Sequence, residues 1–168
     1  MPESVSPGTG RRAARLRGHG RTAARIVRGL EGAVVDFDWL VVRALDLEDP
    51  RTVEARVAGP AALLVAKLHK IDERQGTTRA SDKDALDVFR LLRAVPTHEI
   101  AQRMRLLSTD DRSRAAGERG RAMLRDLFHR GGEGTRMTVR AVEGLLDEAE
   151  VRTACEALAG DLLAALQT

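Results

Sequence analysis

The chain has 168 residues, of which 43% are hydrophobic and 32% charged, and its formal net charge is +3. This length suffices for one domain with a sizeable core, and no apolar run is long enough to cross a membrane. Aromatic residues make up only 2% of the chain, so the core has to be built from Leu, Val and Ala, which favours helices over a β-sandwich. The single cysteine, Cys155, excludes an intrachain disulfide, fits a small core residue and favours a reducing, cytoplasmic setting.

Positive charge is concentrated near the N-terminus, where positions 10–28 hold seven arginines and no acidic residue. Residues 1–30 contain too little apolar material to pack, so we predict a disordered or frayed arginine-rich arm there. The arm is either a solvated tail or a contact surface for nucleic acid, and its composition also resembles a transit peptide. No aromatic residue is present in it to stack on bases, which favours the solvated tail.

The next two runs, residues 32–45 and 52–57, are the most β-like of the chain, and the turn residues 46–51 separate them. They predict a β-hairpin with one buried face. Asp36 and Asp38 stand at positions i and i+2, so on a strand their carboxylates point to the same face. Such a pair can hold a divalent metal through its oxygen ligands. A surface turn, where aspartate is common, is the alternative.

Two helices are predicted over residues 59–74 and 81–95, with a short break at residues 75–80. Leu64, Leu68 and Ile71 recur at i, i+4 and i+7 and define the buried stripe of the first helix. Ser81 is a good N-cap for the second helix, which ends before Pro96.

Charged residues line a neighbouring face of both helices. A short connection makes the helices antiparallel, so the cations of the first face the carboxylates of the second. All three lysines of this arginine-rich chain lie here, which suggests a need for compact ammonium groups. Recognition of phosphate is one interpretation of this cluster, and a set of interhelical salt bridges is the other. The residues are Lys67, Lys70, Arg74, Lys83, Asp84 and Asp87.

Residues 97–128 predict helices, and a break follows at residues 131–134. Residues 137–166 are rich in Ala, Leu and Glu and predict one or two amphipathic helices with a bend near Gly144 or Glu150. No zinc signature, nucleophile elbow or dinucleotide fingerprint is present. The four histidines are widely separated in the sequence and are predicted to be surface residues. They are His19, His69, His98 and His129.

The motif VAGPAALLVAKLHKIDER, followed by DKDALDVFRLL, resembles the later motifs of nucleotidyltransferase-like proteins of the AbiEii/AbiGii type, within the DNA-polymerase-beta-like superfamily. In that family a strand leads through proline into a helix with a spaced lysine and arginine, matched by Lys67 and Arg74. A second motif then opens the next helix, matched by Lys83, Asp84 and Asp87. The resemblance spans about residues 52–93.

The resemblance implies an α+β, predominantly helical fold. Residues 31–95 correspond to a nucleotidyltransferase-like core remnant, a hairpin plus two helices, and residues 96–168 to a C-terminal helical region. It also implies an NTP bound at the charged cluster and, if the protein is active, transfer of a nucleotidyl group with Mg²⁺. Such proteins act as toxins in bacterial toxin–antitoxin or phage-defence systems, so an antitoxin partner and an RNA or tRNA acceptor are expected.

The superfamily's catalytic Gly-Ser turn and following Asp-x-Asp pair do not occur before the lysine helix. Asp36 and Asp38 are the one candidate metal pair, and no Gly-Ser precedes them. A truncated or degenerate nucleotidyltransferase is therefore expected. The alternative from another functional class is a non-catalytic helical protein that binds a partner or nucleic acid through its basic arm.

Overall fold

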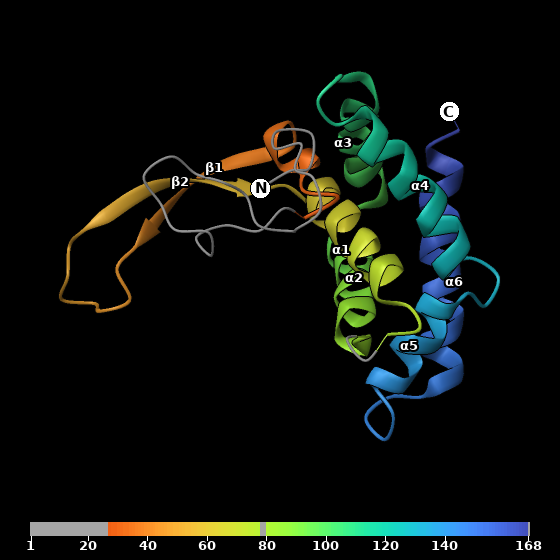
Figure 1. Ribbon diagram of the computed structural model, residues 1–168. Helices are drawn as coiled ribbons and strands as arrows, with labels where there is room; N and C mark the ends of the chain where they lie inside the picture. Colours follow the sequence, from red (N-terminus) through yellow and green to blue (C-terminus); the bar gives the residue numbers. More distant parts are fainter. Residues whose placement is uncertain (1–26, 78–79, 168) are drawn as a thin grey trace.

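The architecture is predominantly helical, with one small sheet (Figure 1). The computed structural model describes residues 27–77 and 80–167, and this part of the chain holds six α-helices and a two-stranded antiparallel sheet. The predicted α+β class with a helical majority is confirmed. No helix in these residues is long and apolar enough to cross a membrane. The elements are the 3-10 turn η2 (Glu31–Val34), strands β1 (Phe37–Arg43) and β2 (Thr52–Ala58), and helices α1 (Pro60–Arg74), α2 (Asp82–Ala94), α3 (Thr97–Thr109), α4 (Arg114–Phe128), α5 (Glu133–Ala141) and α6 (Glu148–Ala165).

Helix α1 is central to the helical body and packs against α2, α3 and α4. It begins at Pro60, whose missing N–H removes no hydrogen bond in a first turn. The predicted stripe of Leu64, Leu68 and Ile71 is buried, with at most 2% of each residue exposed. The 3.6-residue periodicity therefore predicted the buried face of α1 correctly.

One hydrophobic core joins all six helices and continues across the predicted boundary between residues 95 and 96. Cys155 lies in a smaller buried cluster with Phe89 and Val139, which packs α6 against α2 and α5. Burial raises the pKa of its thiol to about 11, so the cysteine is an inert core residue, as predicted. The larger core includes Leu64, Leu92, Leu107, Leu124, Met137 and Leu162.

Two buried glycines bring α4 close to its neighbours. A Cβ added at Gly120 would lie 2.8 Å from Val65 Cγ2 in α1, and one at Gly117 would lie 3.2 Å from Leu107 Cβ in α3. These glycines lower the intrinsic helix propensity of α4, but they also allow the three helices to approach one another. The close packing of the three helices therefore offsets the low helix propensity of the two glycines.

Helix α5 begins earlier than predicted, inside the glycine-rich stretch at residues 131–134. Its first residue is Glu133, and Gly132 occupies the N-cap. A Cβ on Gly132 would lie 2.4 Å from the Leu127 carbonyl oxygen, so glycine is required for the chain to pass the end of α4. The predicted bend is at Gly144, whose φ of 74° turns the chain between α5 and α6.

His69 corrects another expectation, because this histidine was predicted at the surface. It is only 8% exposed, and its Nε2 lies 3.4 Å from the Ala116 carbonyl oxygen of α4. Helical periodicity places it one residue after Leu68, at the edge of the buried stripe, so its ring packs between α1 and α4.

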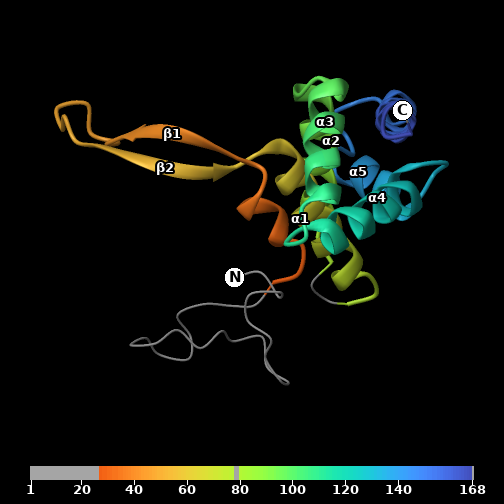
Figure 2. The ribbon, with the colours of Figure 1, turned by 90° about the horizontal axis from the view of Figure 1, so that it is seen from above.

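Strands β1 and β2 form a hairpin that projects from the N-terminal end of α1 (Figures 1 and 2). The register runs from Phe37 opposite Ala58 to Arg43 opposite Thr52. The predicted hairpin is confirmed, but the predicted buried face is not, since most residues of both strands are exposed. No described helix covers either face along the length of the ribbon.

We predict that Gly120→Ala and Gly160→Ala have opposite effects on stability. A Cβ at Gly160 meets only His129, at 3.8 Å, so alanine there should raise the free energy of unfolding by up to about 1 kcal/mol through helix propensity. The contact with Val65 should make Gly120→Ala destabilising by about 1–3 kcal/mol. Denaturant unfolding of the two variants measures both, and equal stabilisation would contradict close packing of α4 on α1.

Candidate functional site

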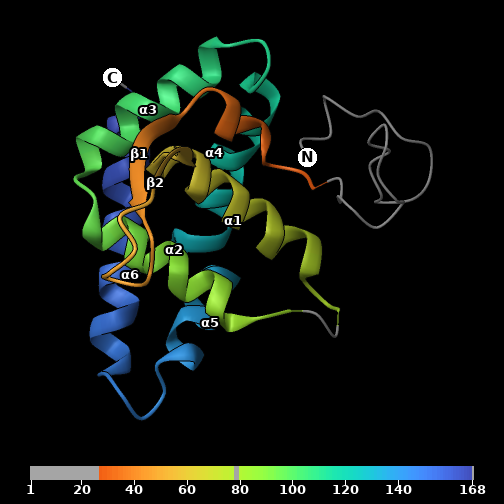
Figure 3. The same ribbon diagram turned by 90° about the vertical axis from the view of Figure 1, so that its left-hand side faces the viewer.

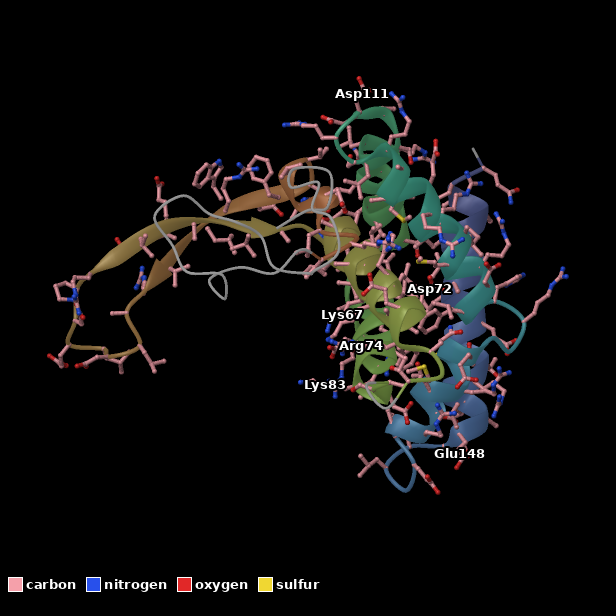
Figure 4. The ribbon with its side chains drawn as sticks, in the orientation of Figure 1. Lys67, Asp72, Arg74, Lys83, Asp111 and Glu148 are labelled. Carbon is pink, nitrogen blue, oxygen red and sulfur yellow. The ribbon has the colours of Figure 1, made fainter. Side chains whose placement is uncertain are left out.

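The predicted charged cluster forms at the seam between α1 and α2. Lys67, Lys70 and Arg74 lie on one face of α1, as their spacing predicted, and the first turns of α2 place Asp84 and Asp87 opposite them. Figure 4 shows Lys67, Arg74 and Lys83 on the side of the helical body from which the hairpin projects. We call Lys67, Lys70, Arg74 and Lys83 the cationic cluster.

Asp84 is the centre of this arrangement and is only 3% exposed. Its Oδ1 accepts hydrogen bonds from Lys70 Nζ at 2.6 Å and from Lys67 Nζ at 3.1 Å. Its Oδ2 accepts a longer bond of 3.4 Å from Arg74 Nη1. Lys67 Nζ also donates to Asp87 Oδ2 at 2.6 Å, so this ammonium bridges both carboxylates of α2.

These contacts favour the charged forms of the Asp84 carboxylate and the Lys67 ammonium. Burial alone would raise the pKa of Asp84, but the hydrogen bonds and charges of Lys70 and Lys67 outweigh it and lower that pKa below the ordinary aspartate value. Burial alone would lower the pKa of Lys67, but Asp87 and Asp84 outweigh it and raise that pKa. Around neutral pH Asp84 and Lys67 are therefore both charged.

Positive charge exceeds negative charge at this seam. The cluster contributes four cations against Asp84 and Asp87, which leaves a net charge of +2. About a third of each cationic side chain from α1 is exposed: 30% for Lys67, 36% for Lys70 and 35% for Arg74. Lys83 is exposed and makes no ion pair with residues 27–77 or 80–167. An anion that approaches from solvent therefore meets partly exposed N–H donors and a positive potential.

The predicted metal pair, Asp36 and Asp38, has a different setting at the N-terminal end of α1. Asp36 is 3% exposed; its Oδ2 accepts a hydrogen bond from the Ala62 backbone N–H at 2.8 Å, and its Oδ1 accepts one from Arg103 Nη1 at 2.9 Å. Arg103 also donates to both oxygens of Asp38, at 3.0 and 3.2 Å. The two carboxylates thus share one guanidinium, although Asp36 precedes β1 and only Asp38 lies in the strand, so the predicted placement of both on one strand is not what brings them together.

This geometry does not fit a Mg²⁺ site, because the oxygens of Asp36 are held by a backbone N–H and by Arg103, and those of Asp38 by Arg103 alone. A divalent cation would lie next to the guanidinium that now neutralises both carboxylates. Among the described residues no group of three or more His, Cys, Asp or Glu could hold a metal ion. The Mg²⁺ role of Asp36 and Asp38 stays a prediction, and we derive no chemical step from it.

A cavity of about 360 Å³ lies where the base of the hairpin meets α1 and the junction of α2 and α3. Its walls are mostly apolar, with Asp38 and Glu99 at the polar edge. Leu63 lines it and precedes Lys67 by one helical turn, so the cavity and the cationic cluster are neighbours on α1. The other apolar walls include Leu40, Val57, Leu91, Val95 and Pro96.

Two features of this region were absent from the sequence-based prediction. Arg103 reaches Asp36 across 67 positions of sequence, and nothing in the local pattern of α3 distinguishes it from the other arginines. The cavity combines residues from five elements, β1, β2, α1, α2 and α3, none of which is unusual by itself. No protein-family model, curated protein or solved structure matches the chain, so the site has to be interpreted from its own geometry.

We predict that Asp84→Asn lowers the free energy of unfolding by about 1–3 kcal/mol at neutral pH, because it removes the carboxylate that compensates buried parts of three cations. The folded-state pKa of Asp84 is lowered, so its contribution is present above the ordinary aspartate pKa of about 3.9 and is lost as pH falls through the folded value. Urea unfolding from pH 7 to pH 3 should therefore show a shallower acid loss for the variant than for wild type. Asp111→Asn is the control, since that side chain is 88% exposed, and a loss as large as that of Asp84→Asn would contradict the account.

We predict that Arg103→Gln destabilises the protein by about 3 kcal/mol, because the buried carboxylate of Asp36 loses its guanidinium partner. Asp38→Asn should cost less, since the Asp38 side chain is 51% exposed. Thermal melts of both variants and of wild type, with and without Mg²⁺, measure these effects. The geometry predicts no rise in the wild-type melting temperature with Mg²⁺; a rise abolished by Asp38→Asn would instead support the metal pair.

Proposed function

We propose that the protein is a nucleotidyltransferase-like protein that binds a nucleoside triphosphate through the cationic cluster. The observation that carries this proposal is the excess of four cations over two carboxylates on one partly exposed seam. Polyphosphate is the common biological anion with enough charge to use several such cations together. Lys67, Lys70, Arg74 and Lys83 would contact its oxygens.

Asp84 and Asp87 take a positioning role in this proposal. They hold the ammonium of Lys67 between them at 3.1 and 2.6 Å, so its rotamer is fixed before any ligand arrives. A cation that is already oriented loses less conformational entropy on binding. The carboxylates thus lower the net charge but improve the geometry of the donors.

The neighbouring cavity supplies a place for the base and sugar. Its volume of about 360 Å³ falls within the range of small-molecule sites, of roughly 300–1,000 Å³. Leu63 and Leu91 offer apolar surface to a base, and Lys67 stands one helical turn from Leu63. This neighbourhood favours a nucleotide over inorganic polyphosphate.

Nucleotidyl transfer itself is the further part of the proposal, and it is supported by the resemblance of residues 52–93 to the AbiEii/AbiGii type. It would use Mg²⁺ and pass the nucleotidyl group to an RNA or tRNA acceptor, in a bacterial toxin–antitoxin or phage-defence setting with an antitoxin partner. The pairing of Asp36 and Asp38 with Arg103 favours nucleotide binding without transfer.

The second candidate is a non-catalytic interaction protein. The exposed hairpin supports it, because Trp39, Val41 and Val53 are each at least 60% exposed. The basic arm that would contact nucleic acid lies almost wholly in residues 1–26, outside the described residues. This candidate does not require a nucleotide.

Isothermal titration with ATP, GTP, CTP and UTP, with and without Mg²⁺, tests the proposal. We expect at least one nucleotide to bind, and Lys67→Ala to weaken it by about tenfold or more, the loss of one charge-assisted hydrogen bond of about 1.5–3 kcal/mol. Lys83→Ala should also weaken binding, and it removes no ion pair among the described residues, so the fold is kept.

Arg152→Ala is the matched control, an exposed cation on α6 away from the seam. Circular dichroism of each variant separates loss of binding from loss of fold. The proposal is wrong if no nucleotide binds, or if nucleotide binds equally to wild type, Lys67→Ala and Lys83→Ala.

A further inference from the structure

The two faces of the hairpin differ in composition. The register places Asp38 opposite Val57, Leu40 opposite Ala55 and Val42 opposite Val53, and paired residues of an antiparallel ribbon share a face. Apart from Asp38, which Arg103 neutralises, this face is entirely apolar. We call it the apolar face, and its residues are Leu40, Val42, Val53, Ala55 and Val57.

The opposite face is mixed and partly covered by its own side chains. Arg56 places its guanidinium carbon 3.7 Å from the centre of the Phe37 ring, and Trp39 meets the same ring edge to face, at 6.3 Å between centroids. Glu54 and Arg43 lie farther along this face. Apolar and charged residues therefore alternate in β2, as in a sheet with one buried face, whereas β1 also places Trp39 and Val41, 63% and 61% exposed, on the mixed face.

The apolar face is nevertheless open to solvent. Leu40 is 48% exposed, Val42 46%, Val53 60% and Val57 38%. An isolated two-stranded hairpin is marginally stable in water and becomes stable when its apolar face packs on another layer. Within residues 27–77 and 80–167 no such layer lies over the outer part of this ribbon.

The tip of the hairpin is apolar and acidic. Leu45 and Leu47 are 102% and 96% exposed, so neither contributes to packing within the described part of the chain. Asp46 and Glu48 alternate with them and make no ion pair with the described residues, although Asp46 Oδ1 accepts the Glu48 N–H at 3.0 Å. A pair of fully exposed leucines on an ordered turn is unusual unless another surface receives them.

The base of the hairpin and α1 form a corner whose apolar and positively charged surfaces complement the apolar and acidic tip. The cavity there is lined by Leu40 and Val57 of the apolar face and by Leu63 of α1, and the cationic cluster begins one helical turn beyond Leu63. Figure 3 looks from the tip toward the body and shows α1 running from the base of the hairpin to one side, with α2 next to it. The corner is thus apolar at its apex and positively charged along one wall.

We propose that the apolar face and the tip dock onto a second copy of this chain, as a two-fold symmetric dimer with exchanged hairpins. The hairpins run antiparallel with their apolar faces packed together, about 10 Å apart as in stacked sheets. Each strand has seven residues and spans about 23 Å, so full overlap places each tip at the base of the partner's hairpin. There the tip leucines enter the partner's cavity, so the tip and the base of a bound nucleotide compete for the same space.

The hairpin surface is complementary to itself, which favours a second copy of this chain over a different partner. In a two-fold dimer one surface patch has to match itself, and here a single patch carries both the projecting leucines and the apolar cavity. The charges also match, because Asp46 and Glu48 of one tip approach the cationic wall of the other corner. One arrangement therefore satisfies the apolar face, the tip and the corner together.

Sedimentation equilibrium of the full chain without nucleotide tests the dimer independently of nucleotide binding. We expect a concentration-dependent dimer that Leu45→Ser with Leu47→Ser reduces at least tenfold in association constant. Both leucines are almost fully exposed, so the double variant should fold normally. Leu145→Ser is the matched control, since Leu145 is 79% exposed in the loop between α5 and α6, and it should leave the association unchanged.

Covalent trapping tests the arrangement itself. In the double variant Leu47→Cys with Leu63→Cys, the hairpin length of about 23 Å separates the two thiols within one chain, well beyond the roughly 7 Å that a disulfide tolerates between Cα atoms. Mild oxidation should give a covalent dimer, whereas Leu145→Cys with Leu63→Cys should not. A wild-type monomer at all concentrations up to the high micromolar range, or a dimer that neither the tip substitutions nor the cysteine pair affects, overturns the proposal.

Discussion

The buried carboxylate of Asp84 is the constraint around which the charged part of this protein is arranged. It draws Lys67, Lys70 and Arg74 to one seam of α1 and α2, at 3.1, 2.6 and 3.4 Å. Without it, three cations on adjacent turns of α1 would repel one another across the surface. Because the pKa of Asp84 is lowered, the carboxylate remains an anion through the physiological range.

Stability alone is a weak reason for such a seam. Replacing a buried ion pair by well-packed apolar residues is often neutral or stabilising, and α1 and α2 already share a core through Leu68 and Val88. A seam that keeps more cations than carboxylates leaves positive charge uncompensated, which costs stability unless an anion binds. This imbalance is what links the packing of the two helices to the proposed nucleotide site.

Asp36 has the corresponding role for the hairpin. Its backbone oxygen accepts the Gly59 N–H at 3.0 Å, its carboxylate accepts the Ala62 N–H in the first turn of α1, and Arg103 joins it to α3. A Cβ on Gly59 would lie 2.0 Å from Asp36 Oδ1, so only glycine permits this contact. One residue thus fixes the direction in which the hairpin leaves the body and the shape of the corner beneath it.

The sequence predicted what depends on local periodicity. The buried stripe of α1, the opposed charges of α1 and α2 and the hairpin itself follow from spacings of two, three, four and seven residues. Contacts that depend on the assembled fold could not be predicted in this way. Arg103 pairs with Asp36 over 67 positions, Gly120 serves the packing of α4 on α1, and the alternation in β1 indicates a face suited to burial but not what covers it.

The start of α5 shows a related limit. Several glycines in a row predict a break, yet Gly132 is required by its close approach to the Leu127 carbonyl oxygen, and the helix begins at the next residue. Glycine occurs both where a side chain would clash with another element and where the backbone needs a conformation that other residues avoid. The sequence does not distinguish these two causes, whereas the structure does.

Lysine acetylation followed by mass spectrometry tests the central claim most directly, because the chain's three lysines, Lys67, Lys70 and Lys83, all lie in the cationic cluster. The account predicts that nucleoside triphosphate slows the acetylation of all three together, while a lysine-containing reference peptide in the same tube reacts at an unchanged rate. Asp84→Asn should weaken the protection of Lys67 and Lys70, since it releases these two lysines from their fixed positions. Acetylation rates that do not change with any nucleotide would contradict the account.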